Sequence, residues 1–132
     1  MIRVLIVDDQ VMFRKQLSQL LSRAGLEVIG EAPDIPSARS LVRKLKPDLV
    51  VVDLMLPGMS GLAGIPLLIG ERTNLKVVLV SAYHDRARIL RTSALEAGAE
   101  GFYPKDSLDQ DVIESWIEEF AHSNLEGGHH DE

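Results

Sequence analysis

The sequence lacks cysteine, long apolar runs and an excess of positive charge, and each absence excludes a class of protein. Without cysteine, disulfide bonds and thiolate metal sites are excluded. No apolar run approaches the roughly 20 residues that span a bilayer, and no basic segment followed by a long apolar stretch directs export. We therefore expect a cytoplasmic protein that does not contact membranes. A net charge of -6 also predicts no direct contact with nucleic acid.

The length and the hydrophobic pattern indicate one α/β domain. A chain of 132 residues buries roughly two-thirds of its unfolded surface. Short β-branched runs alternate with longer segments of helical period, as in a doubly wound sheet. We assign residues 1–121 to the domain and the polar residues 122–132 to a flexible tail. Strands are expected at 2–7, 27–32, 49–53, 76–81 and 101–104, with five helices that follow them.

Two helices carry particular expectations. Between 61 and 73 the chain contains Gly64, Pro66 and Gly70, which weaken helix formation, so we expect a short, late-starting or kinked helix there. The fourth helix is expected at about 85–97. The last helix is expected to be capped by Ser107, with Gln110 completing a capping box.

Polar residues close four of the predicted strands. Asp8 and Asp9 follow the first, and Asp53, Ser81 and Lys105 lie at the ends of three others. Because the carboxyl ends of parallel strands meet at one edge of the sheet, these side chains are predicted to converge there. Each also has a structural interpretation: an aspartate or the serine could cap the following helix, Asp53 could be solvated, and Lys105 could be a surface lysine.

The predicted group of side chains suits phosphoryl chemistry. A carboxylate such as Asp53 can act as a nucleophile on phosphorus. Three carboxylates repel one another unless a cation lies among them, and an all-oxygen site selects a hard ion such as Mg²⁺. Lys105 can follow a phosphate as a point charge, and Ser81 can donate a hydrogen bond to a phosphoryl oxygen.

Four segments together resemble the receiver domain of two-component response regulators. They are Asp8-Asp9, residues 53–61 (DLMLPGMSG), Ser81-Ala82 and residues 97–105 (AGAEGFYPK). The resemblance runs from about residue 2 to residue 120. It implies a flavodoxin-like fold with five helices around a five-stranded parallel sheet of order 2-1-3-4-5.

The resemblance also implies a metal site and a phosphoacceptor. Asp9, Asp53 and the backbone carbonyl of Met55 would bind Mg²⁺, or Mn²⁺, directly, and Asp8 would bind it through water. Asp53 would take a phosphoryl group from a phosphohistidine on a sensor histidine kinase or a phosphotransfer protein, assisted by Lys105. The domain would catalyse only its own phosphorylation and dephosphorylation and would not be an enzyme with other substrates.

The resemblance further implies an output surface. Ser81 would report the phosphoryl group to Phe102, which lacks the hydroxyl of a tyrosine, so the coupling would depend on packing. The fourth helix, fifth strand and last helix would then contact an effector domain, a partner protein or a second copy in a homodimer. Lys105-Asp106-Ser107 resembles the subgroup fused to helix-turn-helix DNA-binding domains, which implies control of transcription through a domain not in this chain.

Three alternatives stay open on the sequence. The chain could be a stand-alone phosphorelay receiver. A haloacid-dehalogenase-like phosphatase also uses an aspartate nucleophile, but it normally has a second aspartate where this chain has Met55. A nucleotide-binding module predicts a glycine-rich loop after the first strand, where this chain has Asp8-Asp9-Gln10.

Overall fold

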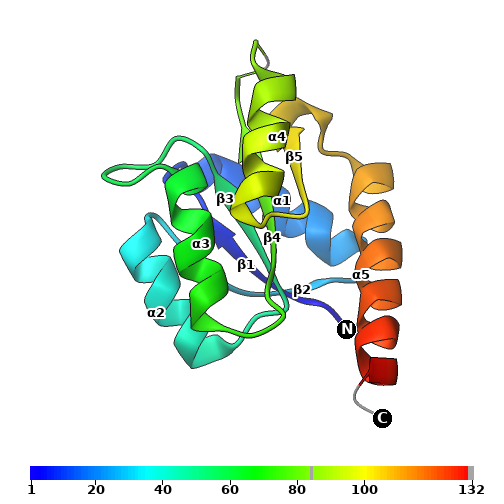
Figure 1. Ribbon diagram of the computed structural model, residues 1–132. Coiled ribbons are helices and arrows are strands. Elements are labelled where there is room, and N and C mark those ends of the chain that lie inside the picture. The colour runs from blue at the N-terminus through cyan, green and yellow to red at the C-terminus, as the bar shows by residue number, and fades with distance from the viewer. Residues whose placement is uncertain (84, 131–132) are drawn as a thin grey trace.

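A computed structural model of the chain describes residues 1–83 and 85–130 (Figure 1). Its five strands pair in parallel in the order β2-β1-β3-β4-β5, which confirms the predicted doubly wound sheet. Pro104 ends β5 at the edge of the sheet, where its missing N–H removes no bond from a central ladder. The strands are β1 (Arg3–Val7), β2 (Glu27–Ala32), β3 (Leu49–Asp53), β4 (Lys76–Ser81) and β5 (Gly101–Pro104).

Helices cover both faces of the sheet. Helices α1 and α5 pack on one face, and α2, α3 and α4 pack on the other (Figure 1). Each layer encloses its own cluster of buried apolar side chains, so the domain has two cores separated by the sheet. The helices are α1 (Val11–Arg23), α2 (Ile35–Leu45), α3 (Gly61–Glu71), α4 (Ala87–Ala97) and α5 (Gln110–His130), and Lys105–Ser107 form a 3₁₀ turn.

The strands supply both cores by alternation. In β1, Val4 and Ile6 belong to the core under α1 and α5, whereas Leu5 and Val7 belong to the core under α2 to α4. All five residues of β3 are buried. This double burial explains why the central strands are continuous apolar runs, and it holds the last residue of β3, Asp53, in a fixed position at the sheet edge.

Helix α3 is neither short nor late-starting, which were two of the three forms expected for it, and the third, a kink, stays a prediction. It begins at Gly61 and has 11 residues, as many as α2 and α4. Its glycines allow close packing: a Cβ at Gly61 would collide with the carbonyl oxygen of Asp53, and one at Gly64 would collide with Cδ1 of Ile35. Tertiary packing therefore outweighs the low helix propensity of this segment.

The starts of the last two helices also differ from the predictions. Ser107 does not cap α5, because it lies in the 3₁₀ turn and Asp109 accepts a hydrogen bond from the N–H of Val112 at 2.9 Å. A carboxylate is favoured at this position because it also interacts with the helix dipole. Helix α4 begins at Ala87 rather than at residue 85.

Helix α5 extends to His130. It therefore continues through most of residues 122–132, which we assigned to a tail, while the remainder of that segment lies outside the described residues. The domain boundary at residue 121 stays a prediction. Within residues 1–83 and 85–130, no helix combines the length and the apolar character that a membrane crossing requires.

Candidate functional site

The polar strand ends meet at the carboxyl edge of the sheet, as predicted. Among the polar and charged residues that the structure describes, only Asp8, Asp53 and Ser81 are buried, with 0%, 3% and 0% of their surface exposed. All three lie at this edge. Burial of polar groups is costly unless they are paired or bind a ligand, so their concentration at one place marks a functional site.

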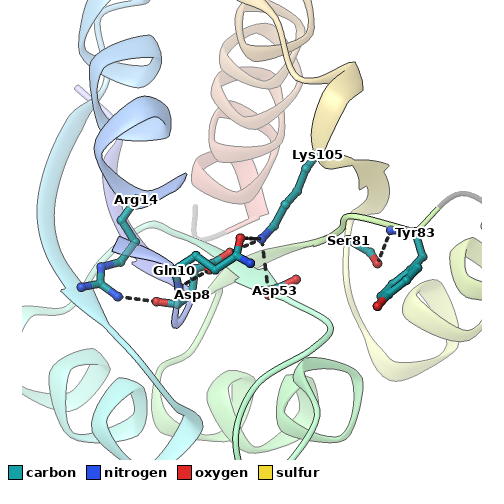
Figure 2. A network of polar contacts seen from close by, with 7 residues as sticks. All are labelled: Asp8, Gln10, Arg14, Asp53, Ser81, Tyr83 and Lys105. Carbon is teal, nitrogen blue, oxygen red and sulfur yellow. Dashed lines mark hydrogen bonds and ion pairs between the residues drawn. The ribbon is translucent and has the colours of Figure 1, made fainter. Parts of the chain in front are cut away.

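Lys105 reaches the two buried carboxylates from the end of β5 (Figure 2). Its Nζ lies 2.7 Å from Oδ2 of Asp8 and 3.5 Å from Oδ2 of Asp53. The ammonium also lies 3.3 Å from Oε1 of Gln10 and 4.2 Å from the centre of the Phe13 ring. With only 12% of its side chain exposed, Lys105 is not a surface lysine, and its shortest ion pair is with Asp8.

The acidic cluster fits a divalent cation. Asp8, Asp9 and Asp53 each offer a carboxylate oxygen, and these oxygens lie within 4.8 Å of one another. Oδ1 of Asp8 accepts a hydrogen bond from the N–H of Gln10, whereas its buried Oδ2 accepts none and only faces the ammonium of Lys105. A set of three hard oxygen donors with no sulfur or nitrogen suits Mg²⁺ or Mn²⁺.

The electrostatics of Asp53 also indicate excess negative charge. Its pKa is raised from the ordinary 3.8 to about 6, first by burial and then by the charge of Asp8. Lys105 and a hydrogen bond from the backbone N–H of Met55 oppose this rise. One ammonium therefore does not compensate the buried carboxylates, and a bound cation would favour the ionised form of Asp53.

Asp8, Asp9 and Ser81 do not serve as caps of the helices that follow them. The residue that precedes α1 is Gln10, which makes no side-chain cap, and the residue that precedes α4 is Arg86. The Oγ of Ser81 instead accepts a hydrogen bond from the N–H of Tyr83 at 3.1 Å (Figure 2). Ser81 follows Val80, the residue that pairs with Asp53 across β3 and β4, so it lies beside the candidate phosphoacceptor.

Phe102 lies on β5 beneath α4. Its side chain is 1% exposed and belongs to the same core cluster as Ala94 of α4. The neighbouring Tyr103 points to the opposite core, where its ring packs edge-on against Trp116 of α5. Phe102 is therefore placed to affect α4 by packing, and its role as a switch stays a prediction.

Four further residues lie around the site and are not among the predicted site residues: Gln10, Phe13, Arg14 and Glu31. The first two contact Lys105, and Arg14 donates from Nη1 to the backbone carbonyl of Asp8 at 2.6 Å. The spacing of Gln10, Phe13 and Arg14 contained a signal, because residues three and four positions apart share one helix face and Gln10 immediately precedes α1. Glu31, on β2, had no such signal. Which way that face points depends on packing against the sheet.

The fold and the site together define a class of protein, a doubly wound α/β domain with an acidic site at the carboxyl edge of its sheet. The family model for the response regulator receiver domain matches residues 4–117. The chain therefore belongs to the receiver domain family of two-component response regulators, as the sequence analysis predicted.

Two curated relatives illustrate different contexts for this domain. A protein-glutamate methylesterase/protein-glutamine glutaminase from Nitrosomonas europaea is 38% identical over 91% of this chain and 34% of its own length. The chemotaxis protein CheY from Thermotoga maritima is 35% identical over 86% of this chain and 92% of its own length. The chain thus spans about a third of the methylesterase relatives but nearly all of CheY.

Solved structures show the same fold. The signal receiver domain of NarL from Mycobacterium tuberculosis has a TM-score of 0.80 and 30% identity, covering 91% of this chain and 96% of that one. CheY in the CheX-CheY-BeF3-Mg²⁺ complex from Borrelia burgdorferi has a TM-score of 0.76 and 28% identity, covering 94% and 89%.

Proposed function

We propose that this domain is a phosphorylation-activated receiver in which Asp53 accepts a phosphoryl group from a phosphohistidine on a sensor histidine kinase or a phosphotransfer protein. The observation that carries this proposal is the burial of Asp53 at the sheet edge, within reach of Asp8, Asp9 and Lys105. A buried nucleophile beside an ammonium, with two more carboxylates that can hold a cation, suits phosphoryl transfer, in which catalysis consists mainly of positioning and charge neutralisation.

In the proposed reaction a carboxylate oxygen of Asp53 attacks phosphorus and forms an O–P bond. The N–P bond of the phosphohistidine breaks, and its electron pair stays on the leaving imidazole nitrogen. Lys105, which lies 3.5 Å from Oδ2 of Asp53, neutralises part of the charge on the phosphoryl oxygens. Its flexible stem and compact ammonium allow it to move from Asp8 to those oxygens.

The residues that would hold the metal are Asp8, Asp9, Asp53 and the backbone carbonyl of Met55. Bound Mg²⁺, or Mn²⁺, would supply positive charge that lets two anionic reactants approach. The fit of the three carboxylates to a hard cation supports this assignment. A solved relative from Borrelia burgdorferi, at 28% identity, contains CheY with BeF3 and Mg²⁺.

For the output we propose that Ser81 and Phe102 transmit phosphorylation to the surface formed by α4, β5 and α5. The hydroxyl of Ser81 would leave the N–H of Tyr83 and donate to a phosphoryl oxygen, and Phe102 would repack beneath α4. The altered surface would contact an effector domain, a partner protein or a second copy of the chain. The resemblance of Lys105-Asp106-Ser107 to receivers fused to helix-turn-helix domains favours transcriptional control through an effector domain. The match to CheY over 92% of its length favours a stand-alone receiver.

Phosphorylation with a small-molecule donor tests the central step. We expect acetyl phosphate and Mg²⁺ to add one phosphoryl group to the wild-type protein, and we expect none to be added to Asp53→Asn, as measured by intact-protein mass spectrometry. Asp111→Asn, which neutralises an exposed carboxylate on α5, should be labelled like wild type. Labelling of Asp53→Asn would contradict the assignment, and repeated hydrolysis of phosphomonoesters would instead favour a phosphatase.

A further inference from the structure

The loop that carries the acidic pair is held at Asp8 by three hydrogen bonds. The N–H of Asp8 donates to the carbonyl of Ala32 at 2.9 Å, and its own carbonyl accepts from Nη1 of Arg14 at 2.6 Å. Its Oδ1 accepts from the N–H of Gln10 at 2.8 Å. With these contacts made, Oδ2 of Asp8 is directed toward Lys105 and the interior of the site.

Arg14 is itself fixed from the opposite side. Its Nε lies 2.8 Å from Oε1 of Glu31 on β2, and 17% of its side chain is exposed. The guanidinium thus bridges two elements: Nε binds the side chain of Glu31, while Nη1 binds the backbone of Asp8 (Figure 2 shows the second contact). A planar guanidinium can hold two acceptors at a set angle, which a lysine ammonium cannot do.

Of the three carboxylates, that of Asp9 depends most on the Arg14 bridge for its position. Its side chain is exposed, and its carboxylate makes no hydrogen bond or ion pair with any other residue in the described part of the chain. Its place within 4.8 Å of the other two carboxylates is therefore set by the backbone of the loop. The backbone carbonyl that Arg14 holds belongs to the preceding residue, Asp8.

We propose that Arg14, held by Glu31, is a positioning residue for the cation site: through the carbonyl of Asp8 it sets the placement of the Asp8 and Asp9 carboxylates around the ion. This inference rests on the proposed function, because it assumes that these carboxylates bind the cation. Arg14 does not contact the ion or the phosphoryl group. Groups that orient metal ligands in this way typically change metal affinity by 10- to 100-fold when they are altered.

The direction in which the affinity for Mg²⁺ changes distinguishes a positioning role of Arg14 from a purely electrostatic one. Arg14 is a cation near a cation site, so removing its charge would by Coulomb's law tighten the binding of Mg²⁺. Loss of the Arg14 bridge between Asp8 and Glu31 would instead weaken the binding of Mg²⁺. We expect Arg14→Gln to bind Mg²⁺ about tenfold more weakly than wild type, near the lower end of the range for such groups. Arg14→Lys, which keeps the charge but lacks the fork, should also bind more weakly, and so should Glu31→Gln.

The experiment measures the Kd of MgCl₂ for the intact chain by isothermal titration calorimetry. Lys15→Gln is the matched control, because it removes one charge from an exposed neighbouring position on α1. It should bind Mg²⁺ as tightly as wild type or slightly more tightly. Circular dichroism and urea unfolding establish that each variant is folded. Arg14→Lys keeps the test decisive if Arg14→Gln unfolds, because it alters the bridge without altering the charge, whereas Glu31→Gln also removes a negative charge that would itself favour Mg²⁺.

Phosphorylation provides the second measurement. If Arg14 acts only by positioning the cation ligands, saturating Mg²⁺ should restore the labelling rate of the Arg14 variants with acetyl phosphate, and it should not restore that of Asp53→Asn. Unchanged Kd values in Arg14→Lys and Glu31→Gln would overturn this inference and leave the proposed function intact. A wild-type protein that bound no Mg²⁺ and was not labelled would instead overturn both.

Discussion

Removing the charge of Asp53 is expected to stabilise the metal-free protein at neutral pH. The pKa of Asp53 is about 6 in the folded chain against an ordinary 3.8. Between these values the folded chain keeps a proton that the unfolded chain has released, so the free energy of unfolding falls as the pH rises through this window. Above it, the folded protein bears the full cost of a buried carboxylate. The asparagine of Asp53→Asn resembles the protonated acid and avoids this cost.

The expected magnitude follows from the size of the shift. About two pH units at 1.36 kcal/mol each correspond to roughly 3 kcal/mol. Asp53 is 3% exposed, so solvent screens this cost little. Lys105 keeps its ion pair with Asp8 at 2.7 Å, so the substitution leaves no unpaired ammonium. We expect Asp53→Asn to raise the free energy of unfolding by about 2–3 kcal/mol at pH 8 and by only about 0.5 kcal/mol at pH 4.

Urea unfolding in EDTA at pH 4, 6 and 8 measures this difference. The fluorescence of Trp116, the only tryptophan and fully buried, reports the transition. Glu118→Gln removes an exposed carboxylate from the middle of α5 and should change the stability by no more than about 0.5 kcal/mol. Added Mg²⁺ should reduce the advantage of Asp53→Asn, because a ligand stabilises the protein that binds it more tightly.

Two results would refute this reasoning. If Asp53→Asn were no more stable than wild type at pH 8, the ionised carboxylate would carry no net cost in the folded chain. If it were equally stabilised at pH 4 and pH 8, the gain would come from packing and not from charge. Either result would also remove the argument that the site has excess negative charge.

Three further predictions use the same unfolding measurement. Hydrogen bonds from two arginines of α2 lower the pKa of Glu71, so Glu71→Gln should destabilise the protein at pH 7, and this loss should shrink as the pH falls below 4.5. Gly64→Ala should destabilise by about 1–3 kcal/mol because its Cβ would collide with Ile35, whereas Gly70→Ala, with no atom within 4 Å, should stabilise by up to about 1 kcal/mol. Lys105→Gln leaves two buried carboxylates without their ammonium, so it should cost about 3 kcal/mol at pH 8 in EDTA, and Mg²⁺ should recover part of this loss.

The strand-end residues could be predicted because their positions depend on topology alone. A run of buried β-branched residues identifies a central strand, and parallel strands place their carboxyl ends together whatever the detailed packing. Asp53 and Ser81 are the last residues of β3 and β4, so identifying those strands was sufficient to locate them. The same reasoning predicted that Lys105, which follows β5 near the other end of the chain, lies at the site.

Features that depend on packing between distant segments could not be predicted in this way. The start of α3 is set by the contact of Gly61 with the backbone of Asp53, and the glycine pattern alone suggested a weak helix. The bridge from Arg14 to Glu31 joins α1 to β2 and requires the rotation of α1 about its axis. Periodicity identifies which residues share a helix face, but packing determines what that face contacts.

The charges at the site explain why a cation and Lys105 would have separate roles. Three carboxylates and one ammonium leave a net charge of -2 when all are ionised, which a divalent cation matches and a monovalent one does not. In the proposed reaction an arriving phosphoryl group would add negative charge again, and an ion held by Asp8, Asp9 and Asp53 would have little freedom to follow it. Lys105 does have this freedom, because its ammonium already lies between Asp8 and Asp53 on a flexible stem. Lys105→Gln should therefore still bind Mg²⁺ and yet accept the phosphoryl group from acetyl phosphate more slowly than wild type, even when Mg²⁺ is saturating.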